Sequence, residues 1–130
     1  MSSKTFFSIE FDFHASPQLL YQYLSTPSGL SEWFADNVNS RGENFEFIWD
    51  DGEEHAKLIQ SKNNERIRFQ WINGEEDEAD CYFEFKIEVD EITKDVSLIV
   101  SDFSEEDELE ESKLLWENLI SDLKQVLGSA

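Results

Sequence analysis

Two histidines and one cysteine are the residues of this 130-residue chain best suited to metal binding or nucleophilic catalysis. His14 follows a strand-like segment and His55 follows an acidic turn, so the two imidazoles belong to different elements. A zinc site would need both of them, with carboxylates, brought together in space. Cys81 falls on the apolar side of its segment, as a small buried residue would, rather than beside a histidine that could activate it. We therefore expect no catalytic residues, no metal site and no cofactor.

Acidic and basic side chains that could act on a substrate fall on the polar side of the predicted strands. Inward-facing paired carboxylates would indicate acid–base chemistry, and none is expected. Tyr82 also points outward, and Arg66 and Arg68 share the outer side, where we expect them to offset neighbouring carboxylates rather than to bind a substrate anion. The acids with this outward parity are Glu10, Asp12, Glu84, Glu88 and Asp90.

The balance of charge narrows the classes of partner. Thirty acidic and ten basic residues give a formal net charge of −20. Binding to nucleic acid or to an anionic membrane needs clustered Lys and Arg, so both are disfavoured. The acids gather at 50–54, 75–78 and 102–111, without the spacing of a calcium-binding loop. These runs are either solvated turns and a helix N-terminus, or a docking surface for a basic protein partner.

Length and composition predict a single domain over residues 1–130. The hydrophobic fraction is 39%, with eleven Phe and four Trp, which argues against disorder. No apolar run approaches the ~20 residues of a membrane span, and residues 1–5 lack the apolar core of a signal peptide. A single cysteine cannot form an internal disulfide, which fits a reducing compartment. We expect a cytoplasmic protein without membrane insertion.

The elements that must position any site begin with a strand and two short helices. Residues 4–13 alternate apolar and polar side chains, which predicts a half-buried strand. Ser16-Pro17 and Thr26-Pro27 each combine an N-cap residue with a proline at the first helical position. They predict two short helices, the second ending near Phe34.

The rest of the chain shows strand patterns and then one long helix. A polar connection follows Phe34, Asp51-Gly52 reads as a hairpin turn, and the acidic segment 73–80 reads as a longer loop. Ser104, with Asp107 three residues later, is expected to open the last helix, which ends at Gly128. The predicted strands lie at 45–50, 56–58, 66–71, 81–90 and 96–100.

These elements predict an α+β helix-grip fold, in which a curved antiparallel sheet of six or seven strands wraps around the C-terminal helix. Such a sheet is roughly 30 Å wide at ~4.8 Å per strand, whereas a helix is only ~10 Å thick. The twist of the sheet lets it curl around the helix, which leaves space between the sheet and the helix. Inward side chains either line a ligand cavity there or pack as a solid core. The candidates are Trp33, Phe34, Phe47, Trp49, Phe69, Trp71, Phe83, Phe85, Trp116 and Ile120.

The order of elements resembles the START-like superfamily, also called SRPBCC or birch-pollen-allergen-like. Ser16-Pro17, Thr26-Pro27 and Trp33-Phe34 are similar to the opening motif of the branch related to the C-terminal domain of heat-shock-protein ATPase activators. Leu115-Trp116 and the leucines up to Leu127 are similar to the closing helix of that branch. The resemblance implies a cavity for lipids, sterols, polyketides or other apolar ligands; some members of the family are cyclases or dehydratases, and some assist a chaperone.

Three functions follow as expectations. The first is a non-catalytic module that binds a small hydrophobic or amphipathic, lipid-like or aromatic ligand between the sheet and the C-terminal helix. The second is a protein-interaction or chaperone-helper module that uses its acidic surface. The third is a polyketide cyclase-like enzyme, which a cavity-facing residue with a shifted pKa would favour.

Overall fold

Seven antiparallel strands form one curved sheet in the computed structural model, which describes residues 4–72 and 81–128. The order across the sheet is β1-β7-β6-β5-β4-β3-β2. The strands are β1 (Lys4–Phe13), β2 (Asn37–Arg41), β3 (Asn44–Trp49), β4 (Gly52–Lys62), β5 (Arg66–Trp71), β6 (Tyr82–Val89) and β7 (Val96–Glu105). The helices are α1 (Pro17–Ser25), α2 (Pro27–Leu30), the 3₁₀ turn η2 (Glu106–Glu108) and α3 (Leu109–Leu127).

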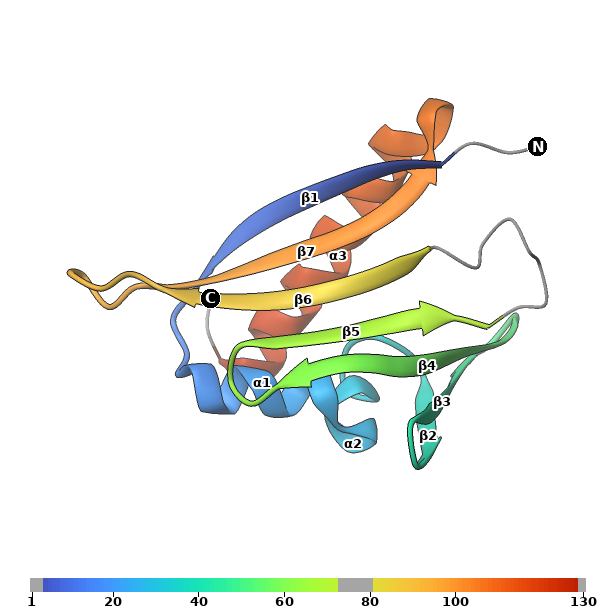
Figure 1. Ribbon diagram of the computed structural model, residues 1–130, viewed down its shortest axis with the longest axis horizontal. Helices are drawn as coiled ribbons and strands as arrows, with labels where there is room; N and C mark the ends of the chain where they lie inside the picture. Colours follow the sequence, from blue (N-terminus) through green and yellow to red (C-terminus); the bar gives the residue numbers. More distant parts are fainter. Residues whose placement is uncertain (1–3, 73–80, 129–130) are drawn as a thin grey trace.

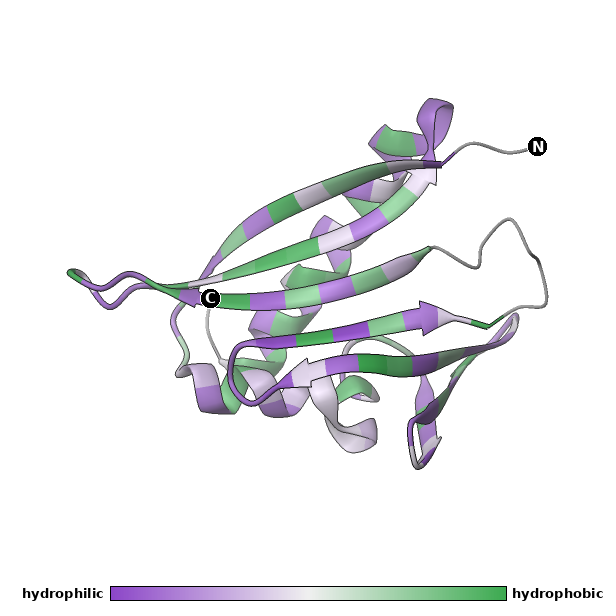
Figure 2. Ribbon diagram, viewed as in Figure 1, coloured by the Kyte–Doolittle hydropathy of each residue, from purple (hydrophilic) through white to green (hydrophobic). Residues whose placement is uncertain are grey.

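The long helix α3 crosses one face of the sheet, behind β7, β6 and β5 in the view of Figure 1. It contributes the buried side chains Trp116, Ile120 and Leu123 to the core. The strands place alternate side chains against it, and the same alternation shows as green and purple bands along each strand in Figure 2. The predicted helix-grip α+β fold is therefore confirmed. None of the described helices is long and apolar enough to cross a bilayer.

The two short helices begin where the sequence predicts. Ser16 Oγ accepts a hydrogen bond from the Leu19 amide at 3.1 Å, and Thr26 Oγ1 accepts one from the Gly29 amide at 3.0 Å. Gly29 lets the helices pack closely, because a Cβ at this position would press against the Gln22 carbonyl and lie 2.6 Å from Tyr23 Cα. The close packing of α1 and α2 thus depends on one glycine.

Several local expectations are wrong. The connection at 37–41 forms an edge strand, β2, whose single buried residue is Val38. The β3–β4 turn is Asp50-Asp51 rather than Asp51-Gly52: Gly52 already pairs with Trp49, and its φ of +154° suits glycine.

Ser104 does not cap the last helix, contrary to the sequence prediction. It lies within β7, and its hydroxyl donates to the Glu105 carbonyl and accepts from the Ser112 hydroxyl at 2.8 Å. The 3₁₀ turn η2 follows β7, and α3 starts at Leu109, so the last helix is shorter than its pattern suggests. The second short helix, α2, is also shorter: it ends at Leu30 rather than near Phe34. The loop predicted at 73–80 lies outside the described residues.

Candidate functional site

The concave side of the sheet and α3 enclose a cluster of aromatic rings centred on Phe34. Phe34 lies between α2 and β2 and is 5% exposed. Its ring centroid is 5.1 Å from that of Phe47, 5.5 Å from that of Phe83 and 5.9 Å from that of Trp116. These are distances of edge-to-face and offset-stacked pairs. Aromatic rings from β3, β6 and α3 therefore all contact the Phe34 ring, which lies between the sheet and α3.

Two indole groups fix the segment that carries Phe34. Trp49 Nε1 donates to the Phe34 carbonyl oxygen at 3.1 Å, and Trp33 Nε1 donates to the Tyr23 carbonyl oxygen at 2.8 Å. Partly buried hydrogen bonds of this kind stabilise a fold by about 1 kcal/mol each, and losing one partner costs more. They tie residues 31–36 to β3 on one side and to α1 on the other.

A groove of about 520 Å³ opens beside Phe34. Residues 31–36, the end of β3 and the C-terminal half of α3 line it. We call it the mouth groove. Its apolar lining includes Phe34, Trp49, Leu119 and Val126, and Val126 is 36% exposed. Pockets that hold small ligands usually measure ~300–1,000 Å³, so the mouth groove is large enough for one.

The charged residues of the mouth groove are all acidic. Glu32, Asp36 and Asp122 lie in its lining and are exposed to solvent, whereas none of the described lining residues is Lys, Arg or His. The groove thus combines an apolar strip with a larger polar lining and a negative rim. Such a surface favours a ligand with an apolar body and a cationic or hydrogen-bond-donating end.

A carboxyl group lies on the inner face of the sheet near the start of α3. Asp102 continues the inward parity of Leu98 and Val100 in β7. Its Oδ2 accepts from Trp116 Nε1 at 2.9 Å, and its Oδ1 accepts from the Phe103 amide at 2.7 Å. Burial raises the pKa of Asp102 from 3.8 to about 6, against the opposing effect of these two hydrogen bonds. Asp102 is not part of the mouth-groove lining.

The ten pocket candidates separate into two groups. Trp33, Phe34 and Trp49 line the mouth groove. The other seven belong to the aromatic interior behind Phe34, where Phe83, for example, lies 4.8 Å from Trp71 between ring centroids. These seven are Phe47, Phe69, Trp71, Phe83, Phe85, Trp116 and Ile120.

The sequence analysis did not predict the groove residues on α3 or the inward-facing carboxyl group of Asp102. Leu119, Asp122 and Val126 recur at i, i+3 and i+7, so helical periodicity alone places them on one face. Asp102 has the inward parity of β7, but the sequence predicts a strand that ends at residue 100 and so leaves Asp102 outside it.

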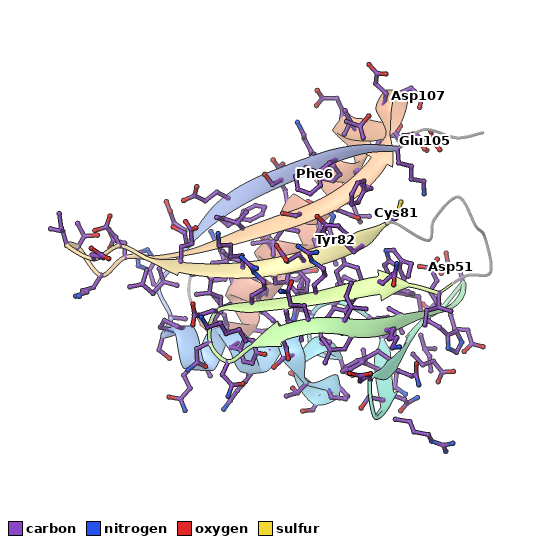
Figure 3. All side chains as sticks on the ribbon, in the orientation of Figure 1. Phe6, Asp51, Cys81, Tyr82, Glu105 and Asp107 are labelled. Atoms are coloured by element: carbon purple, nitrogen blue, oxygen red, sulfur yellow. The ribbon has the colours of Figure 1, made fainter. Side chains whose placement is uncertain are left out.

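The side chains considered for metal or nucleophilic chemistry are dispersed. His14 follows β1 and His55 lies in β4, both exposed. Cys81 is buried just before β6 (Figure 3). Arg66 and Arg68 are on the outer side as predicted, and both contact Glu84: Arg68 Nη2 lies 2.8 Å and Arg66 Nε 3.7 Å from Glu84 Oε2.

Several solved structures share this fold. The Aha1 dimer from Colwellia psychrerythraea superposes with a TM-score of 0.82 at 19% identity, over 95% of this chain and 96% of that one. Protein MLL2253 from Mesorhizobium loti gives a TM-score of 0.77 at 17% identity, over 95% and 97% of the two chains. BfR322 from Bacteroides fragilis is 32% identical, with a TM-score of 0.66, over 98% of this chain and 93% of that one.

No curated protein matches the chain. A family model described as a START-like superfamily domain matches residues 1–129, nearly the whole sequence. The curved sheet around α3 and the short helices after β1 are the architecture that the sequence resemblance implied. This chain therefore belongs to the START-like superfamily.

Proposed function

We propose that this protein is a non-catalytic binding module that holds a small amphipathic ligand between the sheet and α3, in the mouth groove. START-like domains typically bind ligands or act as cyclase-like modules. The observation that carries the proposal is the groove of about 520 Å³ beside Phe34, with its apolar strip and acidic rim.

The chemistry of the groove favours one class of ligand. Trp49, Leu119 and Val126 offer a surface for an aliphatic or aromatic body, whose burial contributes roughly 25 cal/mol per Å². Asp36 and Asp122 on the rim would attract an ammonium or amidinium end and repel a carboxylate. The expected ligand is therefore an amphipathic amine rather than a fatty acid.

A matched pair of probes tests this chemistry. Octylamine and octanoate share the alkyl chain and differ in the sign of the head group. Octylamine should raise the melting temperature and shift the NMR signals of Trp49 and Leu119, because a ligand that binds the folded state stabilises it. Native mass spectrometry of the purified protein should also release a bound small molecule. If neither probe binds and no molecule is released, the proposal fails.

A pair of variants locates the binding. Val126→Arg places a cation in the groove, whereas Leu114→Arg adds the same charge elsewhere on α3, at a residue that is 57% exposed. We expect Val126→Arg to weaken octylamine binding by more than about tenfold, which equals ~1.4 kcal/mol, and Leu114→Arg to leave it within about twofold. Equal effects of the two variants would place the ligand outside the mouth groove.

A second candidate, a protein-interaction module, rests on the N-terminal half of α3. Leu114 and Leu115 are 57% and 59% exposed, and the acidic residues Glu110, Glu111 and Glu117 lie on the same helix. A basic amphipathic segment would complement this surface. Binding of such a partner at low salt should be lost at ~0.5 M NaCl and in the double variant Leu114→Ser/Leu115→Ser. Absence of any partner at low salt would remove this candidate.

A cyclase-like activity is the third candidate and has the least support from the geometry. Asp102 has the raised pKa and the inward position that acid–base chemistry would need. However, Trp116 and the Phe103 amide occupy its two oxygens, and it lies outside the groove lining. The arrangement supports a structural role for this carboxyl group.

A further inference from the structure

Three potential metal ligands lie together on the β3–β4 hairpin, on the outer side of the sheet. Glu46 of β3 pairs directly with His55 of β4, and Glu53 precedes His55 by two residues, so all three side chains leave the same face. One donor atom from each residue lies within 4.8 Å of the other two. We propose that Glu46, Glu53 and His55 form a binding site for one divalent transition-metal ion of the Zn²⁺ class.

The distances suit such an ion. His55 Nε2 lies 3.5 Å from Glu53 Oε2 and 3.8 Å from Glu46 Oε2. Zn²⁺ holds nitrogen and oxygen ligands at about 2.0–2.2 Å, so neighbouring ligand atoms of a tetrahedral site lie ~3.4 Å apart. Small rotations of the glutamate side chains therefore bring the three donors to coordination distance without a change in the backbone.

The donor set selects the class of metal. One imidazole and two carboxylates suit Zn²⁺ and its transition-metal neighbours, whereas Ca²⁺ and Mg²⁺ prefer oxygen ligands alone. The two carboxylates supply negative charge that a divalent cation neutralises. The net charge of −20 further favours the approach of a cation.

The surroundings already orient one ligand. Asn39 Nδ2 donates to Glu46 Oε1 at 3.2 Å, which leaves Oε2 directed at His55. Partners of this kind fix a metal-binding carboxylate in place.

The site leaves a position for a further ligand. The side chains of His55 and Glu53 are 53% and 55% exposed, and Glu46 and His55 also line a hollow of about 490 Å³ beside β2. A metal held by three protein ligands at such a surface keeps an open coordination position for water or an exogenous ligand.

The test is a calorimetric titration of Zn²⁺ into the full chain at about 150 mM NaCl. Excess Mg²⁺ is present throughout to saturate non-selective acidic sites. One Zn²⁺ should bind per chain. His55→Asn, Glu46→Gln and Glu53→Gln should each weaken binding by more than about tenfold, and His14→Asn, which removes the other histidine, should change it less than about twofold. The ring signals of His55, and not those of His14, should shift in NMR spectra.

Two outcomes would overturn the proposal: no Zn²⁺ binding in the presence of Mg²⁺, or binding that persists unchanged in His55→Asn. Because the three side chains are solvent-exposed or partly so, these variants should keep the far-ultraviolet circular dichroism and the melting temperature of the parent protein. A variant that lost both would be replaced by Glu53→Ser, the most exposed position of the three.

Discussion

Adjacent rungs of the β5–β6 ladder show two different ways of stabilising the same sheet. On the inner face Phe69 pairs with Phe83, and their rings stack with centroids 5.1 Å apart. One residue along, on the outer face, Arg68 pairs with Glu84 through a 2.9 Å hydrogen bond. The inner rung depends on apolar burial, and the outer rung depends on charge.

Part of the outer face is nevertheless shielded from water. Glu84 is only 7% exposed, and Arg66 and Arg68 both contact its carboxylate. Arg68 also lies over the Tyr82 ring, 4.0 Å from its centroid. Tyr82 in turn contacts Phe6 and Phe103, with Phe6 and Tyr82 labelled in Figure 3. Strand parity therefore predicts the side of the sheet on which a residue lies, but not whether water reaches it.

The largest effect is expected on the inner rung. Phe83→Ala removes a ring that contacts Phe34, Phe69 and Trp71, and should lower the free energy of unfolding by about 3–5 kcal/mol in urea titrations. Phe83→Leu, which retains most of the volume, should cost clearly less. A loss below ~1.5 kcal/mol for the alanine variant would mean that the interior is loosely packed.

Asp102 tests the apolar character of the inner face, because it is a carboxyl group there. Its pKa in the folded chain, about 6, is above the ordinary 3.8, so folding favours the protonated form. The resulting stability is fully present below about pH 4 and is lost as the pH rises through about 6. Asp102→Asn cannot ionise, so relative to the parent it should gain about 2–3 kcal/mol between pH 4 and pH 8. A pH-independent difference in unfolding free energy would contradict this.

The outer rung should respond to loss of one partner more than to loss of both. Glu84→Ala leaves Arg68 without its closest carboxylate and should cost about 2 kcal/mol. The double variant Arg68→Met/Glu84→Leu replaces the pair with apolar side chains and should cost less than the single one. Chemical unfolding of the double variant and of its two single variants, Arg68→Met and Glu84→Leu, would give the coupling energy; additive losses would mean that the ion pair contributes little.

The smallest effect concerns salt. Self-repulsion at a net charge of −20 is screened by ions, so the melting temperature should rise by a few degrees between about 0.02 and 0.5 M NaCl. Phe83→Leu should show the same salt dependence as the parent, because the inner rung carries no charge. A flat or falling response would mean that attractive charge pairs outweigh the repulsion.

The strands that sequence predicts well are those with unbroken alternation. Residues 4–13 and 66–71 match β1 and β5 because apolar side chains recur at every second position. β2 was missed because Val38 is its only buried residue, and the end of β7 was missed because Asp102 and Ser104 put polar groups on the inward parity. In both cases tertiary contacts, rather than periodicity, decide the structure.

The candidate sites show the same limit. The aromatic residues near Phe34 follow from parity, but which of them border a groove depends on how far residues 31–36 lie from α3. The hairpin cluster depends on strand register. A turn at Asp51-Gly52 would have placed His55 opposite Ile48, whereas the observed turn at Asp50-Asp51 places it opposite Glu46.

The absence of a side chain at Gly29 has a consequence for the width of the mouth groove. Any larger group there would push α2 away from α1 and carry Trp33 and Phe34 outward, since both lie within four residues of the end of α2. A single methyl group at position 29 would therefore widen the mouth groove from outside, because Gly29 is not part of the groove lining.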